Sequence, residues 1–521
     1  MKKNFIILLL FVAIANVSKG QTPTWSETIA PIMYANCTKC HHPGGLGNGS
    51  LLDYADVVAK KYSIIYQVEN KIMPPWPSDP SYRHYADERI LKQSEIDAIV
   101  NWSNNGTPEG DKSKAPAKPV YNNTSKIGAY DLKVKIPTYT STAKTGDIYR
   151  CFSIPTNLPA NKYIAAVEII PGNPKIVHHV LVFQDTTATT DNLDKADPLP
   201  GYTNFGGTGS NNSVLIAPYV PGAEPIVFPT GTGVKLFKNT RIILQIHYPA
   251  GTDTEKDSTY LIIRFTTQPS VREVFIAPML NHENISNGPL IIPKDQVKTF
   301  YQSYTVPINA TLLSVMPHMH LIGKSTKVFV KPATGTDTIP LVKINNWDFH
   351  WQGQYRFQYL QKITPGSKIQ SIVSYDNTIN NPNQPSNPTK TVTLGEATTS
   401  EMMLTYFYFM YYQTGDEKIL QDSSLLQTGG VFKPTTNKFT IHPNPVKDIL
   451  YTGIDLQDAN VRIIDNLGRV VIEKNYQDFI RTTYQLSLLS VDIRGLNPGL
   501  YSVIIRTENN GKIYQSKFIK E

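Results

Sequence analysis

The spacing of apolar residues divides the chain into a short helical part and a long β-rich remainder. Between residues 22 and 105 apolar residues recur at helical spacing, most clearly at Ile96 and Ile99, with Gly106 beyond them as a stop signal. From residue 129 to 425, short apolar runs such as DLKVKIP, KIVHHVLVF and RIILQIHYP alternate with turn-rich segments. The pattern predicts a multi-domain, mainly β protein: a small all-α domain, two β-sandwiches and a small C-terminal β-sandwich.

Polar stretches rich in proline and lysine mark the boundaries between these parts. GTPEGDKSKAPAKPVYNNTSK indicates one linker and TGGVFKPTTNK a second. Beyond the second linker the chain returns to short strands, including a predicted hairpin in VRIIDNLGRVVIE. The predicted order is a signal (1–20), a helical domain (22–105), a linker (106–128), two sandwiches (129–268 and 269–425), a linker (426–437) and a tail (438–521).

The N-terminus has the pattern of a secretory signal peptide. Two lysines precede an apolar run from Phe5 to about Ala15, and Ser18 and Gly20 supply small residues before a cleavage site at Gln21. The run is short for a membrane span, and no later stretch is long enough. We therefore expect export through the periplasm and no transmembrane segment after signal removal.

Charge argues against one class of partner. The net charge of +8 is mild for 521 residues, and the lysines are scattered without an arginine-rich run or a basic helix. Nucleic-acid binding is therefore not expected.

The stretch ANCTKCHHPGG contains two cysteines two residues apart, followed by a histidine. A four-thiol zinc site is excluded because the only other cysteine is Cys151, which we expect to be a buried structural thiol. A redox dithiol would need a βαβ context, which is absent. The remaining interpretation is covalent haem c, with Cys37 and Cys40 bonded to the haem and His41 as an axial iron ligand.

Such a haem needs a sixth ligand from farther along the chain. KIMPPWP offers Met73 on a proline-stiffened loop, and His84 is its main competitor. Histidine–methionine ligation raises the potential and suits electron transfer. With these motifs, residues 24–105 resemble cytochrome c.

Five more histidines are candidate metal ligands in the β-rich region. His318 and His320 lie two apart, so a strand would place both on one face. His178 and His179 are adjacent, so sharing one metal requires a twist or bulge, typically in an edge strand. His247 is a candidate third imidazole for that pair.

Two methionines in SEMMLTYFYF add a different kind of ligand. Met402 is expected to share a strand face with Leu404 and Tyr406. A thioether argues against zinc, calcium and magnesium and favours Cu(I). Two histidine sites, one with sulfur, indicate a pair of copper ions that change oxidation state.

Taken in order, four motifs resemble the copper type II, ascorbate-dependent monooxygenases, which include peptidylglycine α-hydroxylating and dopamine β-monooxygenase. These are His-His, Gln-Ile-His-Tyr, His-X-His-Leu-X-Gly-Lys and Glu-Met before an aromatic strand, within residues 129–425. The resemblance implies two jelly-roll-like sandwiches with one copper each, facing a solvent cleft. It assigns the electron-transfer copper to His178, His179 and His247, and the oxygen-activating copper to His318, His320 and Met402.

Two departures from that family change the expected substrate. The peptide-amidating member holds its substrate's carboxylate with an arginine at the position of Met316, and Leu404 replaces an asparagine, although Tyr406 matches as a substrate contact. A buried carboxylate without a charged partner is costly. A glycine-extended peptide is therefore not the expected substrate. The animal members' several disulfides are also missing here.

The tail resembles the C-terminal sorting domain of the type IX secretion system. Pro-Asn-Pro in FTIHPNPVKDILYTG and the sequence LNPGLY near the end carry this match. The resemblance implies contact with that machinery, export, and secretion or attachment at the cell surface with removal of the tail. His442 then belongs to the sorting signal and is not a metal ligand.

The combined expectation is an exported copper monooxygenase with its own haem c domain. It would hydroxylate a C–H bond of a small organic substrate with O2, using ascorbate, another one-electron reductant or an electron-donor protein. The alternatives are a non-enzymatic electron-transfer or copper-handling surface protein, and a surface adhesin, which would not explain the ligands.

Overall fold

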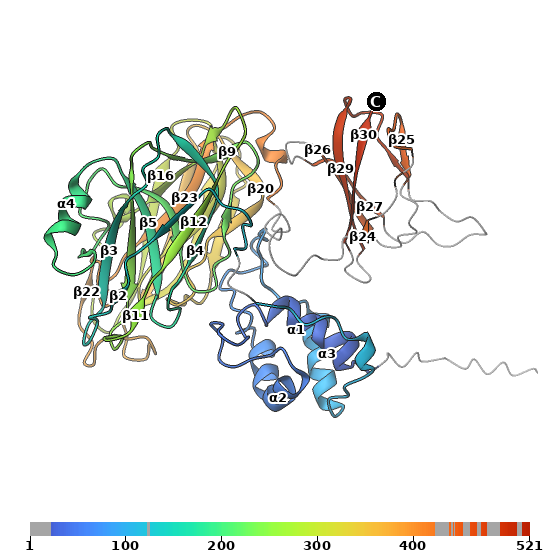
Figure 1. The fold of residues 1–521 in the computed structure, drawn as a ribbon. Coiled ribbons are helices and arrows are strands. Elements are labelled where there is room, and N and C mark those ends of the chain that lie inside the picture. The colour runs from blue at the N-terminus through green and yellow to red at the C-terminus, as the bar shows by residue number, and fades with distance from the viewer. Residues whose placement is uncertain are drawn as a thin grey trace, which may run out of the picture. The chain divides into compact units, whose positions relative to one another are not determined.

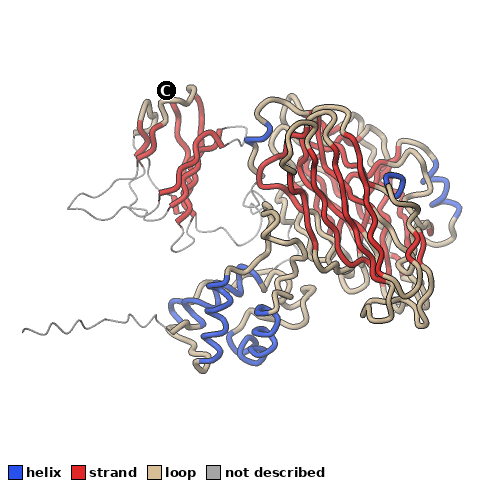
Figure 2. The backbone as a smooth tube through the Cα atoms, turned by 180° about the vertical axis from the view of Figure 1, so that it is seen from behind, coloured by secondary structure: helices blue, strands red, loops and turns tan. Residues whose placement is uncertain are grey.

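The structure is a computed structural model in which the chain forms two compact units, one made of helices and one of strands (Figure 1 and Figure 2). The helical unit contains residues up to Pro74 and Ile90–Lys118, and the β unit contains Pro75–Arg89 and Pro119–Glu521. The prediction of a multi-domain, mainly β protein is confirmed at this level. The described residues are 22–121, 125–421, 437–438, 441, 443–451, 459–465, 470–476, 490–507 and 513–521.

The helical unit packs around a small aromatic core. Trp25 and Trp102 meet at 6.4 Å between ring centroids, and both are almost fully buried. The amphipathic spacing of Ile96 and Ile99 places them in the same core. Its elements are a π-helical turn η1 (Trp25–Ile29), helices α1 (Ala30–Asn36), α2 (Tyr54–Glu69) and α3 (Gln93–Asn104), and a 3₁₀ turn η2 (Lys112–Lys114).

The first part of the β unit is a sandwich whose two sheets share one apolar core. One sheet has the order β1-β12-β4-β9-β13, with β8 on β4, and the other β6-β3-β10-β5-β7; β2 and β11 form a separate pair. The strands are β1 (Leu132–Lys135), β2 (Tyr139–Thr140), β3 (Ile148–Pro155), β4 (Lys162–Ile170), β5 (His179–Asp185), β6 (Tyr202–Thr203), β7 (Val214–Tyr219), β8 (Ile226–Val227), β9 (Thr232–Leu236), β10 (Arg241–Tyr248), β11 (Lys256–Asp257), β12 (Tyr260–Phe265) and β13 (Arg272–Glu273). Helix α4 (Thr189–Ala196) interrupts the strands.

The second part repeats this arrangement with four-stranded sheets in the orders β14-β23-β17-β20 and β16-β21-β18-β19; β15 and β22 form a pair. Its strands are β14 (Phe275–Leu280), β15 (Ile291–Ile292), β16 (Val297–Thr305), β17 (Ala310–His318), β18 (Gly323–Lys331), β19 (Ile339–Ile344), β20 (Tyr355–Ile363), β21 (Lys368–Asp376), β22 (Val392–Thr393) and β23 (Leu404–Tyr411), with 3₁₀ turns η3 (His282–Asn284) and η4 (Asp416–Lys418). Leu313 and Tyr408 join the core of the first part, so the two parts share buried apolar surface.

Residues 75–89, here called the strap, lie between α2 and α3 in sequence but pack on β19 and β20. Tyr85 is 2% exposed, pairs with Phe357 across an antiparallel bridge and donates from its hydroxyl to Leu341 O at 2.8 Å. Asp87 accepts two hydrogen bonds from the guanidinium of Arg356. The compact helical unit is therefore built from two pieces of chain, not from one continuous stretch.

The tail contains a five-stranded sheet in the order β24-β30-β29-β26-β27 and a separate pair of β25 and β28. Its strands are β24 (Asn437–Lys438), β25 (Ile449–Tyr451), β26 (Ala459–Asp465), β27 (Val470–Tyr476), β28 (Ser490–Asp492), β29 (Gly499–Thr507) and β30 (Ile513–Lys520). The predicted signal peptide, most of the second linker and His442 lie outside the described residues. Within the described residues no helix has the length and apolarity to cross a membrane.

Candidate metal centres

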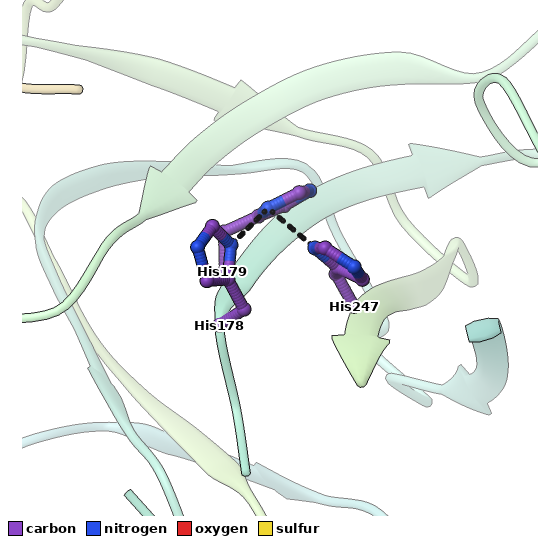
Figure 3. Close-up of side chains that lie close together, drawn as sticks. All are labelled: His178, His179 and His247. Carbon is purple, nitrogen blue, oxygen red and sulfur yellow. Dashed lines mark hydrogen bonds between the residues drawn. The ribbon is translucent and has the colours of Figure 1, made fainter. Parts of the chain in front are cut away.

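Three histidines meet at one end of the inner sheet strands β5 and β10 (Figure 3). His247 on β10 lies directly opposite His179, the first residue of β5, and His178 comes just before that strand. Because His178 is outside the strand, strand alternation does not turn it away from His179. The expectation of a bulged edge strand was therefore wrong: β5 lies between β10 and β7.

The ring nitrogens of these histidines converge. Nδ1 of His179 lies 3.3 Å from Nδ1 of His178 and 3.3 Å from Nδ1 of His247, and one ligand atom from each residue falls within 4.8 Å of the others. Burial lowers the pKa of His178 to about 3 and holds the pKa of His179 well below its usual range, with further lowering from the neighbouring imidazoles. His178 and His179 therefore favour the neutral imidazole, the form that binds metal ions.

His247 is fixed from two sides. The Tyr149 ring, on the adjacent strand β3, stacks on the His247 ring, with ring centroids 4.5 Å apart and an angle of 4° between the ring planes. On the other side, Nε2 of His247 lies 3.2 Å from Oδ2 of Asp147, and this contact is the main reason that the pKa of Asp147 is lowered to about 2. A carboxylate at Nε2 favours the proton there and leaves Nδ1 bare toward the other histidines.

The second predicted group lies at the end of β17. His318 is the last residue of that strand, whereas His320 lies beyond it, and their ring centroids are 5.2 Å apart. The expectation that one strand face presents both residues was wrong. The fully buried carboxylate of Glu401 accepts from the backbone N–H of His320 and of Ile322, each at 2.9 Å, which replaces strand pairing there.

Glu401 also positions the predicted sulfur ligand. It accepts from the backbone N–H of Met402 at 3.2 Å, while Tyr375 donates to Met402 O at 2.7 Å. We had expected Met402 to share a strand face with Tyr406. This was wrong, because β23 begins only at Leu404 and Met402 lies before it. Tyr406 is half-buried on β23 opposite Met316, and burial raises its pKa to about 12.

Carbonyl oxygens determine which ring nitrogen of His318 and of His320 carries the proton. His318 Nδ1 is 2.5 Å from Gln352 Oε1, and His320 Nδ1 is 3.1 Å from Ser400 O. Since a carbonyl oxygen only accepts, both Nδ1 atoms carry the proton and Nε2 is free. Burial lowers the pKa of His320 to about 3 and also lowers that of His318. The two groups therefore offer different ring nitrogens.

The Cys-X-X-Cys-His motif, predicted to bind haem, follows helix α1 in the helical unit. The backbone N–H groups of Cys40 and His41 both donate to Cys37 O, so one tight turn carries all three side chains. Neither Cys37 nor Cys40 forms a disulfide, and burial raises the pKa of Cys37 to about 12. Nδ1 of His41 is buried without a hydrogen-bond partner, and a Cβ at Gly47 would lie 2.5 Å from it.

The two candidates for the sixth iron ligand fall in different units. Met73 belongs to the same compact unit as His41, and its N–H donates to Gln67 O. His84 belongs to the strap, is 64% exposed and contacts Glu88 at 2.9 Å. Cys151 is fully buried on β3, as expected for a structural thiol.

Sequence reasoning missed the residues that orient these histidines. Asp147, Gln352 and Ser400 are 100, 34 and 80 positions from the histidines they contact, so no local motif joins them. Among the residues that orient the predicted ligands, only Glu401 could have been found from the sequence, because it precedes Met402 in the Glu-Met motif.

Comparison with known proteins identifies one part of the chain. Residues 440–521 match the family described as the secretion system C-terminal sorting domain. No curated protein matches the chain.

Several solved structures resemble the chain, with low sequence identity and low TM-scores. PorZ, a surface component of the type-IX secretion system of Porphyromonas gingivalis, is 12% identical with TM-score 0.14; the match covers 24% of this chain and 14% of that one. The glycosylasparaginase PNGase F of Flavobacterium meningosepticum is 10% identical with TM-score 0.24, covering 54% and 97%. VP2 of infectious bursal disease virus is 11% identical with TM-score 0.17, covering 57% and 76%.

The tail match agrees with the Pro-Asn-Pro and LNPGLY motifs. It indicates export, with secretion or attachment at the cell surface. Residues 440–521 are a type IX secretion sorting domain.

Proposed function

We propose that the chain is an exported copper-dependent monooxygenase that hydroxylates a C–H bond of a small organic molecule. The convergence of the three imidazoles of His178, His179 and His247 carries this proposal, and burial favours the neutral form of His178 and His179. One atom of O2 enters the C–H bond, and the other leaves as water with two electrons and two protons. When bound, copper supplies the one-electron changes and the oxygen activation that this reaction needs.

The chemistry of the donor sets favours copper. The first group contains imidazoles only, and the second adds the thioether of Met402, which Glu401 holds by the backbone next to His320. Imidazole suits copper, and soft sulfur favours Cu(I) over zinc. His318, His320 and Met402 would hold the oxygen-activating ion, and the first group the electron-transfer ion.

The surrounding residues orient the ligands and limit the substrate. Asp147, Gln352 and Ser400 hold protons on the ring nitrogens that face away from the metals. Met316, 8% exposed, replaces the arginine expected to hold a substrate carboxylate, so the substrate class is uncharged near this position. Tyr406, opposite Met316, is the proposed substrate contact.

The fused helical unit would supply electrons. Cys37 and Cys40 would hold the haem, and His41 and Met73 the iron; haem c, when bound, is a one-electron carrier. The buried, unpartnered Nδ1 of His41 and the close approach of Gly47 fit a ring that is fixed by packing. Ascorbate or an electron-donor protein would reduce the haem.

Oxygen uptake tests the activity. The copper- and haem-loaded full chain should consume O2 with ascorbate and candidate substrates, and 18O2 should label the hydroxylated product. His320→Ala should abolish product formation, whereas His282→Ala, the same change at an exposed histidine outside both groups, should not. Copper binding without product from any substrate would instead favour a copper-handling or electron-transfer protein.

Metal analysis and spectra test the sites separately. Wild-type protein should bind two copper ions, with one lost in His247→Ala and the other in His320→Ala. Met73→Ala should lower the haem potential, with His84→Ala as the control. A haem that acid-acetone extracts, or a potential that changes only in His84→Ala, would contradict the haem assignments.

A further inference from the structure

A fourth histidine lies beside the first histidine group, at the surface of the β unit. His350 belongs to the loop between β19 and β20, and its side chain is 65% exposed. Its ring centroid lies 6.0 Å from that of His178, with an angle of 71° between the ring planes. His350 belongs to neither proposed ligand set, and the proposed reaction gives it no role.

The separation of the His178 and His350 rings is one that a shared metal ion allows. Because a metal–imidazole bond is about 2 Å long, two rings on one ion have centres up to about 6 Å apart. The three ring pairs within the first group are closer, at 5.6, 4.9 and 4.8 Å. His178 and His350 can therefore share an ion in an open arrangement of two ligands, which holds the ion less tightly than three.

Asp348 orients the His350 ring for such an ion. Its Oδ1 accepts from the backbone N–H of His350 at 2.9 Å and lies 3.1 Å from Nδ1 of the same residue. A carboxylate at Nδ1 holds the proton there and leaves Nε2 as the free nitrogen. The preceding residue, Phe349, stacks on the His178 ring with centroids 5.2 Å apart, so this part of the loop packs against the first group.

Exposure falls stepwise from His350 into the first group. His350 is exposed, His178 is half-buried, and His247 is 1% exposed. An ion that moves from water to a buried site loses its hydration, which is costly unless a ligand replaces the water at each step. His350 and then His178 supply ligands in the order in which an ion from solution would meet them.

We propose that His350 and His178 form an entry site that takes Cu(I) from solution and passes it to the group of His178, His179 and His247. The transfer is a ligand exchange: the bond from copper to His350 breaks as bonds to His179 and His247 form, and the oxidation state does not change. His178 is the ligand common to both positions. This inference rests on the proposed function only in that the first group binds copper.

The test measures copper transfer into the full chain with haem attached. His320→Ala is present in every sample, so that copper binds at the first group alone. Cu(I) is supplied without oxygen as a complex with a soluble chelator, and elemental analysis after rapid gel filtration gives the bound copper at each time. Adding His350→Ala should lower the loading rate several-fold, whereas adding His282→Ala, at another exposed histidine, should not.

Release distinguishes an entry ligand from a ligand of the final site. A group that binds the ion only in passing lowers the barrier in both directions, so His350→Ala should slow release into excess chelator by the same factor and leave the affinity unchanged. His350→Met should restore fast loading, because its soft sulfur binds Cu(I), and His350→Gln should not.

Three results would overturn the entry site. These are unchanged rates in His350→Ala, a lower equilibrium affinity in that variant, which would place His350 in the final ligand set, and equal loading rates in His350→Met and His350→Gln. Absence of copper from the first group in wild-type protein would overturn the proposed function as well. Copper loading that depends on His350 in a protein without oxygen uptake would overturn the monooxygenase alone.

Discussion

Asp147 Oδ2 lies 3.2 Å from His247 Nε2 and accepts a hydrogen bond from Thr398 Oγ1 at 3.0 Å. Thr398 belongs to the second sandwich, two residues before Ser400, which accepts from His320. The carboxylate of Asp147 therefore orients His247 of the first histidine group. It is itself oriented by the segment Thr398–Ser400, which also contacts His320 of the second group.

Asp147→Asn should weaken copper binding at the first group about 10- to 100-fold, because the amide cannot hold the Nε2 proton of His247 as the carboxylate does. Competition with a Cu(I) chelator measures the affinity. Thr398→Val removes only the supporting hydroxyl and should have a smaller effect in the same direction. Equal affinities for wild-type protein and Asp147→Asn would contradict the orienting role.

Above about pH 8, the value to which burial raises the pKa of Glu401, Glu401→Gln should destabilise the β unit by about 1–3 kcal/mol, because one acceptor oxygen facing backbone N–H groups becomes a donor. Denaturant unfolding measures the free energy. The matched control is Glu396→Gln, the same change at an exposed carboxylate five positions earlier. If both variants unfold alike, Glu401 does not organise the backbone at His320 and Met402.

Gly47→Val should disturb the His41 ring without removing the thiols that bond the haem, because its Cβ would lie 2.5 Å from Nδ1. Covalent haem should persist while the spectrum and potential change. Leu46→Ala, at the exposed neighbour, should leave both unchanged. An unaltered spectrum in Gly47→Val would show that His41 lies elsewhere when haem is attached.

Acid should release the strap. Hydrogen bonds from Ser81 and then Lys343 hold the pKa of Asp79 below its usual range, so its stabilisation is present above about pH 3.9, the unfolded value, and is lost as pH falls through the lower folded value. The amide of Asp79, which donates to Lys343 O, should lose protection against hydrogen exchange in acid, measured relative to the rate of an unstructured amide at the same pH. In Asp79→Asn this protection should be lower already at neutral pH, unlike in Asp337→Asn, an exposed control.

Local pattern predicts much of the secondary structure here, because helices and strands follow short-range periodicity. Ile96 and Ile99 lie in the helical core, and His247 lies in a strand. The pattern did not reveal that β17 ends at His318, because the cause is Glu401, 81 positions from His320. The packing of Phe349 against His178 and His320 was equally hidden, since folding alone brings these rings together.

The strap shows a second limit of local pattern. Residues 75–89 lie within the stretch that resembles cytochrome c, and nothing in their spacing says that Tyr85 and Asp87 bind β20. Their partners, including Arg356, are more than 250 positions away. Sequence order therefore places the strap in one domain, and side-chain pairing places it in the other.

Residues 75–89 belong to the β unit but lie in sequence between the two pieces of chain that form the helical unit. This order has a consequence for how the protein withstands proteases outside the cell. A single backbone cut in the linker after residue 105 severs one covalent connection, yet residues 75–89 remain bound to β19 and β20 by ring packing and by the Asp87–Arg356 pair. The nicked protein should therefore elute as one particle and separate only in denaturant. A deletion of residues 22–105 does something different, because it also uncovers the surface that Tyr85 buries.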